Sequence, residues 1–174
     1  MHITPTWKNA KHLLEKYDGS ATEIFIVGLS LSQVPAVMDV LSELPTIKIT
    51  TFVNETFEFP EAINSEWLFR LKAIPIKSCQ HALLSASGTA QHLQIYLWID
   101  VETATLEVEL VFWNDLTFPN HLDTHEYEQR LQTLVLLAEA CRQGTPEAQC
   151  ILAPEHNGPI EELLERQNAY RVVW

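Results

Sequence analysis

Two alternating segments at residues 92–113 place the strongest constraint on the fold. Residues 92–100 and 105–113 alternate aliphatic with aromatic or polar side chains, a pattern typical of β-strands. Pairing Ile99 with Leu106 gives one apolar face, and a slip of one residue would exchange the two faces. The sequence therefore predicts a β-hairpin. Its other face carries these side chains: Tyr96, Trp98, Glu107, Glu109 and Trp113.

Acidic charge is concentrated around this hairpin. The formal net charge is −12, and residues 78–129 contain eight acidic side chains and no Lys or Arg. Binding to nucleic acid or to anionic lipid is disfavoured, because contacts with phosphate need basic side chains. A basic protein partner is favoured, since complementary charge speeds encounter and rejects wrong partners. The alternative is the ordinary acidic surface of a soluble bacterial protein.

The remaining pattern predicts one α+β domain over residues 1–174. We expect a mixed, mostly antiparallel sheet, with the hairpin at about 92–113 in its centre and helices covering it. A long helix is expected at about 124–143, because Asp123 and Glu126 fit a capping box at its start. The order of strand 23–29, helix 33–43 and strand 46–53 suggests a right-handed βαβ crossover. We also expect helices at 5–18 and 160–167, strands at 67–76, 150–153 and 170–174, and a short helix or irregular segment at 77–86.

The compartment is predicted from the cysteines and the first residues. Cys79, Cys141 and Cys150 are odd in number and lack CxxC spacing, which suggests reduced thiols. The first residues lack the basic and apolar regions of a signal peptide, and no apolar run reaches the length of a membrane span. We therefore expect a cytoplasmic protein that does not enter a membrane.

No motif predicts catalysis, a cofactor or a metal. The turn at residues 28–32 has one glycine and no Lys, so it matches neither nucleotide-binding loop pattern. His121 and His125 have HxxxH spacing and are weak metal candidates, but they lie on either side of the predicted cap at Asp123. They would therefore not share one helix face. The sequence favours a binding protein over an enzyme and predicts no cofactor.

The hairpin's aromatic and acidic side chains are the candidate binding surface. Tyr and Trp are enriched at interface hot spots, and carboxylates beside them would pair with Arg or Lys of a partner. The alternative is that the long helix, or the first helix, covers this face and makes the aromatic residues part of the core. Burying the unpaired carboxylates of Glu107 and Glu109 would be costly, so we expect this face to be at least partly exposed to water. The predicted partner-binding residues are Tyr96, Trp98, Asp100, Glu102, Glu107, Glu109 and Trp113.

The general profile of a small, acidic α+β chain without a catalytic motif is similar to that of immunity proteins of bacterial toxin systems and of secretion chaperones. This resemblance is at the level of class and assigns no residue a role. It implies a protein that neutralises or escorts a basic protein partner. One alternative is a small enzyme or ligand-binding domain built from His121, His125, His156 and Asp115. Another is a homodimer formed through the hairpin or through the strand at 170–174.

Overall fold

The computed structural model describes residues 4–44, 47–51, 80–86, 93–100, 103–155, 160–165 and 171–174. The described strands are β1 (Ala21–Ser30), β2 (Ile47–Thr51), β3 (Gln80–Ala86), β4 (Leu93–Asp100), β5 (Thr105–Trp113), β6 (Gln149–Pro154) and β7 (Val172–Val173). The described helices are α1 (Trp7–Leu14), the 3₁₀ helix η1 (Leu31–Gln33), α2 (Val34–Ser42), α4 (Asn114–Thr117), α5 (Thr124–Cys141) and α6 (Ile160–Glu165).

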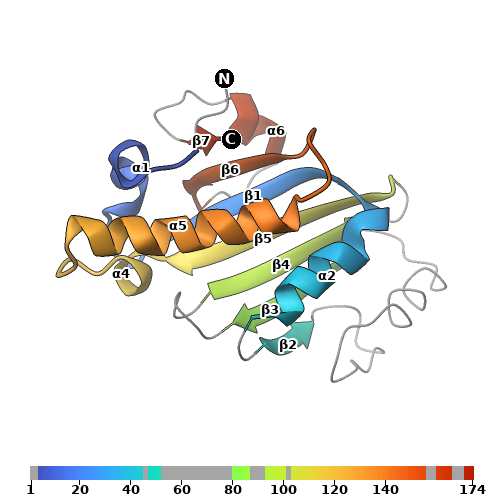
Figure 1. Cartoon of the computed structure of the whole chain (residues 1–174), viewed down its shortest axis with the longest axis horizontal. Coiled ribbons are helices and arrows are strands. Elements are labelled where there is room, and N and C mark those ends of the chain that lie inside the picture. Colours follow the sequence, from blue (N-terminus) through green and yellow to red (C-terminus); the bar gives the residue numbers. More distant parts are fainter. Residues whose placement is uncertain are drawn as a thin grey trace.

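These strands form one sheet in the order β2-β3-β4-β5-β1-β6-β7, and each neighbouring pair is antiparallel. The predicted α+β class is confirmed, and the hairpin of β4 and β5 lies in the middle of the sheet (Figure 1). The predicted register is also confirmed: Ile99 pairs with Leu106, Tyr96 with Glu109 and Trp98 with Glu107.

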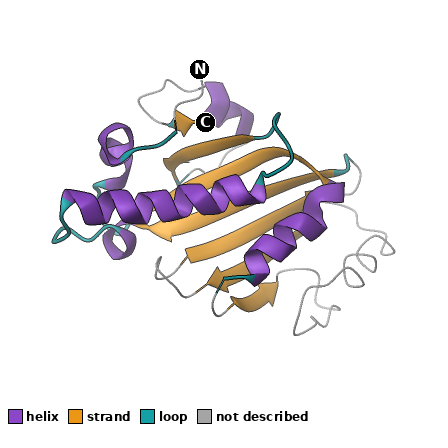
Figure 2. Cartoon of the chain, in the orientation of Figure 1, coloured by secondary structure: helices purple, strands orange, loops and turns teal. Residues whose placement is uncertain are grey.

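Helices α5 and α2 lie across one face of the sheet (Figures 1 and 2). The aliphatic side chains of the hairpin point to these helices, and Leu97, Val108 and Leu110 are almost completely buried there. Leu131 and Leu134 of α5 belong to the same core, because side chains three and four residues apart share one side of a helix. The long helix therefore covers the aliphatic face of the hairpin.

The start of α5 is fixed by the predicted capping box. The side chain of Asp123 accepts a hydrogen bond from the Glu126 backbone N–H at 2.8 Å, and Glu126 Oε2 accepts one from the Asp123 N–H at 2.9 Å. Because the helix begins at Thr124, His121 precedes it and His125 lies in its first turn. The two histidines therefore do not share a helix face, as the sequence predicted.

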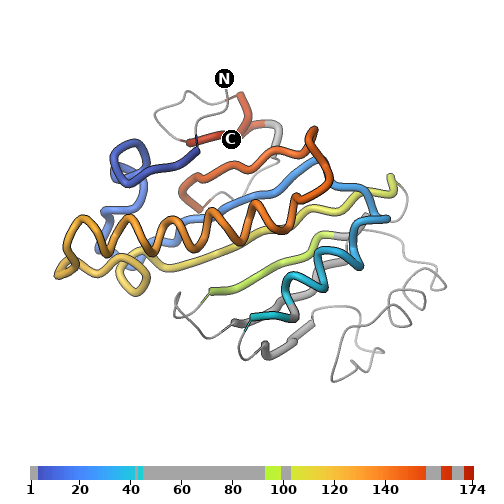
Figure 3. The backbone as a smooth tube through the Cα atoms, viewed as in Figure 1, coloured from blue at the N-terminus to red at the C-terminus, as the bar shows by residue number. Residues whose placement is uncertain are grey.

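Among the described elements, α6 packs on the other face of the sheet, near β1 and β6. There Leu163 packs with Val27, Ile151 and Ala153 in a small second core. Figure 3 shows how far apart in the sequence these strands are: β1, in blue, runs between the yellow β5 and the orange-red β6.

A bulge in β1 keeps this strand in register with β5. Ile26 pairs with Val108 and Leu29 with Leu106, so β1 contains one residue more than β5 over this interval. Gly28 lies in the bulge with a φ of +83°, a conformation that glycine adopts readily. The extra residue turns Leu29 back to the helix-covered face, where it is buried.

One sequence-based expectation is corrected, and another lies outside the described residues. Strands β1 and β2 run in the same direction in one sheet and are joined through α2, as the expected βαβ crossover requires, but β3, β4 and β5 lie between them. Part of 77–86, expected as a short helix or irregular segment, is strand β3, since β2 and β4 supply hydrogen-bonding partners on both sides. The strand expected at 67–76 lies outside the described residues. Among the described helices, none is both long and apolar enough to span a bilayer.

Candidate partner-binding face

The candidate site lies on the sheet face opposite α5. Side chains alternate along a strand, so the residues between the buried aliphatic positions of β4 and β5 point to this face. It carries the five hairpin side chains predicted from the sequence together with Glu23 of β1. We call this surface the acid–aromatic face, and its residues are Glu23, Tyr96, Trp98, Glu107, Glu109 and Trp113.

The aromatic residues of this face are not part of the main core. Tyr96, Trp98 and Trp113 are half-buried, as is Glu107, whereas Glu109 is 9 % exposed. The sequence left open whether α5 or α1 covers these side chains, and both helices belong to the core on the opposite face. The acid–aromatic face is therefore partly accessible around a carboxyl group that is nearly buried.

The side chains of Trp98 and Tyr96 lie next to Glu109. Trp98 Nε1 donates a hydrogen bond to Glu109 Oε2 at 2.7 Å. The rings of Tyr96 and Trp98 lie nearly parallel, with centroids 6.2 Å apart and planes inclined by 19°. The indole thus fixes the position of the carboxyl group and places an aromatic surface beside it.

The structure adds Glu23, which the sequence analysis did not select. Glu23 lies on β1 opposite Val111, and Glu109 lies opposite the next same-face residue of β1, Phe25. The two residues are therefore diagonal neighbours across adjacent strands. Glu23 is 5 % exposed. The alternation of side chains along residues 23–29 could have indicated which face Glu23 points to. However, the residues that follow Glu23 are apolar on both faces, so the sequence resembles a strand that is buried on both sides.

Burial dominates the electrostatics of Glu109. It raises the pKa above the ordinary value of 4.5, the hydrogen bonds with Trp98 and Glu23 lower it, and the charge of Glu155 raises it. The net shift is upward, because desolvation disfavours the charged form. Tyr96 also has a raised pKa, first from burial and then from the nearby carboxylates of Glu109, Glu23 and Glu155.

Glu155 brings a third carboxylate to this region. It follows β6 directly, its backbone N–H donates to the Ala21 carbonyl at 3.2 Å, and its side chain is exposed. The charge of Glu155 therefore acts on both Glu109 and Tyr96, although these residues lie far apart in the sequence.

Two predicted partner-binding residues have no described side-chain position. Asp100 pairs with Thr105 at the end of the hairpin, so its backbone is placed beside the face. Glu102 lies outside the described residues. Neither residue contributes to the geometry given above.

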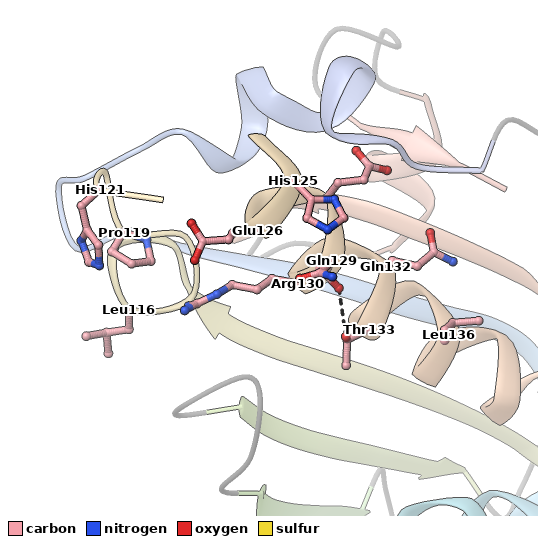
Figure 4. Close-up of a pocket in the computed structure, with 11 residues that line it drawn as sticks. Leu116, Pro119, His121, His125, Glu126, Gln129, Arg130, Gln132, Thr133 and Leu136 are labelled. Atoms are coloured by element: carbon pink, nitrogen blue, oxygen red, sulfur yellow. Dashed lines mark hydrogen bonds between the residues drawn. The ribbon is translucent and has the colours of Figure 1, made fainter. Parts of the chain in front are cut away.

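A second candidate region is a hollow of about 980 Å³ beside the first half of α5 (Figure 4). His121 and His125 both line it, together with the exposed side chains of Leu116 and Leu136. Glu126 also lines the hollow, and its Oε2 accepts a hydrogen bond from the Asp123 N–H at the helix cap. In the part of the chain that the structure describes, no three His, Cys, Asp or Glu side chains gather as metal ligands would. Asp115 is not among the lining residues, and His156 is not described.

The fold and the acid–aromatic face define an α+β protein with helices on one side of its sheet and an acidic, aromatic surface on the other. No family model matches the chain, and no curated protein matches it. Among solved structures, it is similar to a chain of the crystal structure of the toxic C-terminal tip of CdiA from Pseudomonas aeruginosa in complex with an immune protein. The TM-score is 0.53 at 9 % sequence identity, and the similarity covers 78 % of this chain and 86 % of that chain. At this identity the similarity concerns the fold alone.

Proposed function

We propose that this chain is a protein-binding domain that holds a basic segment of a protein partner on its acid–aromatic face. The observation that carries the proposal is the nearly buried Glu23–Glu109 carboxyl pair, on the sheet face that α5 does not cover. A Lys or Arg side chain of a partner that docks beside these two carboxyl groups would form charge-assisted hydrogen bonds, which are strong in a poorly hydrated site.

The surrounding side chains suit an arginine better than a lysine. A guanidinium group can bind a carboxylate through two parallel hydrogen bonds and can also stack on an aromatic ring. Trp98 provides a ring next to Glu109, and Glu107 adds a further carboxylate on the neighbouring strand position. The net charge of −12 would also speed encounter with a basic protein.

The comparison with solved structures supports an immunity-like or escorting role. The crystal structure that contains the similar chain holds a toxic protein tip and an immune protein. We propose by analogy that the present chain neutralises or escorts a basic protein in the cytoplasm. The analogy rests on fold, whereas the acid–aromatic face provides the independent chemical argument.

The test is a charge reversal on this face with a matched reversal elsewhere. Wild-type protein and Glu107→Lys would be used to capture proteins from a lysate of the native host, and the captured protein would then be purified for affinity measurements. We expect Glu107→Lys to weaken binding by at least about tenfold, which is the scale of an interface hot spot. Wild-type binding should also weaken when salt rises from about 50 to about 300 mM, because exposed charges are screened.

The matched control is Glu147→Lys, which makes the same charge change at an exposed residue in the turn before β6. We expect it to bind like the wild type, and circular dichroism would establish that both variants fold. If Glu107→Lys and Glu147→Lys bound the purified partner equally well, the acid–aromatic face would not be the binding site.

A further inference from the structure

The exposed side chains of α5 carry no charge between residues 129 and 136. They are Gln129, Gln132, Thr133 and Leu136, and we call these four residues the uncharged stripe. Figure 4 shows them along the helix, where they line the hollow beside α5. The solvent side of a surface helix usually carries charged residues, and this chain has a net charge of −12. The stripe is therefore an unusual surface for so acidic a chain.

Leu136 makes part of this surface apolar. It is 58 % exposed, and it lines the hollow together with Leu116, which is 42 % exposed. Only three large hydrophobic residues are exposed in the described part of the chain, and these are two of them. Depletion of charge and exposed apolar groups side by side are typical of the centre of a protein interface.

The charged residues next to the stripe are already hydrogen-bonded within the chain. Glu128 Oε2 accepts a hydrogen bond from the Trp7 backbone N–H at 2.6 Å, and Arg130 Nη1 donates one to the Thr117 carbonyl at 2.8 Å. A protein that docks on the stripe therefore does not need to supply a matching charge.

We propose that the uncharged stripe binds the same stripe of a second copy of this chain, with the two α5 helices antiparallel. The stripe has the chemistry that it requires of a partner, because two uncharged surfaces can meet without placing like charges together. This matters for two copies that each carry a net charge of −12. Antiparallel helices also place the positive end of each helix dipole beside the negative end of the other.

The spacing of the stripe suits a two-fold axis between Gln129 and Gln132. Residues 125, 129, 132 and 136 are three or four residues apart and share one side of the helix over about 16 Å. Across the axis, Gln129 would face Gln132 of the second copy, and an amide group can both donate and accept. Leu136 would face the end of the other hollow that Leu116 and His125 line.

The size of the surface predicts a weak dimer. Eleven residues line the hollow, whereas a stable interface has about 20–30 residues on each side. We therefore expect reversible association in the micromolar range or weaker.

Such a dimer would carry two binding faces. Because α5 covers the sheet face opposite the acid–aromatic face, the interface would leave both acid–aromatic faces uncovered. Two basic segments of one partner could then bind together, with a gain in avidity. This consequence rests on the proposed function, whereas the dimer itself does not.

The test is sedimentation of the full chain at concentrations from about 10 to about 500 µM. We expect the average mass to rise from the 19.9 kDa of one chain toward twice that value. Added salt should strengthen the dimer, because it screens the repulsion between two acidic copies. Salt should weaken the binding of a basic partner, so the two proposals can fail separately.

Two matched variants locate the interface. Gln132→Glu would bring like charges together beside the two-fold axis, and we expect it to raise the dissociation constant of the dimer at least about tenfold. Gln143→Glu makes the same change at an exposed residue that does not line the hollow, and it should associate like the wild type. Leu136→Ala, which shortens an exposed side chain, should also weaken the dimer.

Circular dichroism would establish that the three variants fold. A single-chain mass for the wild type over the whole concentration range would overturn the proposal. Equal association of Gln132→Glu and Gln143→Glu would overturn it as well, because the dimer would then use another surface.

Discussion

Trp98 connects the two chemical parts of the acid–aromatic face. Its ring packs beside Tyr96, and its Nε1–H donates to Glu109. This hydrogen bond lowers the pKa of a carboxyl group whose burial raises it. Removing the indole N–H of Trp98 should therefore change both the free energy of unfolding and the pKa of Glu109.

We predict that Trp98→Phe destabilises the fold by about 1–3 kcal/mol, because it removes the indole N–H and leaves Glu109 Oε2 without that partner. The pKa of Glu109 should rise further, which carboxyl NMR would detect. Trp113→Phe, at another half-buried tryptophan of the same face, is the control for lost ring area. Equal losses of stability in the two variants would show that the hydrogen bond contributes little.

At the scale of single elements, β1 depends on its bulge. Without the extra residue, β1 could not place Glu23 on the acid–aromatic face and Leu29 in the main core at once. The bulge needs a positive φ at Gly28, and the Cα of Ala148 lies 3.4 Å from where a Cβ would stand. A side chain there would meet both backbone strain and a tight contact.

We predict that Gly28→Ala destabilises the protein by more than Gly144→Ala. Both glycines have a positive φ, +83° and +86°, so both substitutions should cost about 1–2 kcal/mol for the left-handed conformation. Only Gly28 has a backbone neighbour within contact distance of the added Cβ, whereas Gly144 has nothing within 4 Å. Urea unfolding of the two variants would measure the difference; equal losses would mean that the bulge tolerates the methyl group.

The elements that the sequence predicted best are those whose signals are local. The hairpin register follows because one pairing places all the aliphatic side chains on one face and all the aromatic and acidic side chains on the other. The start of α5 follows from the capping box that Asp123 and Glu126 form three residues apart. Strand β3 lacked such a signal, because its conformation is set by pairing with β2 and β4. Glu23 was missed since its partner Glu109 lies far along the chain.

At the scale of the whole molecule, strand order was the least predictable property. Strands β1 and β2 are joined through α2 and run in the same direction, but three later strands are inserted between them. This order depends on pairing between strands far apart in the sequence, so no short stretch of sequence encodes it. The sequence therefore placed the hairpin residues of the acid–aromatic face on paired strands, while the addition of Glu23 and Glu155 required the assembled sheet.

A homodimer through the C-terminal strand stays a prediction, and the sheet suggests a specific test. Cys150 and Trp174 exchange both backbone hydrogen bonds, so the N–H of Val173 points away from β6. If β7 pairs with a second copy, sedimentation should give twice the 19.9 kDa of one chain. Val173→Pro should then restore the single-chain mass while leaving the β6–β7 ladder intact. A single-chain mass for the wild type, or an unchanged dimer for the variant, would contradict this interface.

The position of β1 also sets the order in which the molecule can be assembled during synthesis. Strand β1 emerges from the ribosome before its partners on either side, β5 and β6, which lie about 80 and 120 residues later in the sequence. Its buried side chains have no sheet to join until those strands exist, and closing such long loops slows folding. The nascent chain therefore carries an unpaired, largely apolar strand until β5 and β6 have been synthesised, and early helix packing or chaperones would have to cover it during that time.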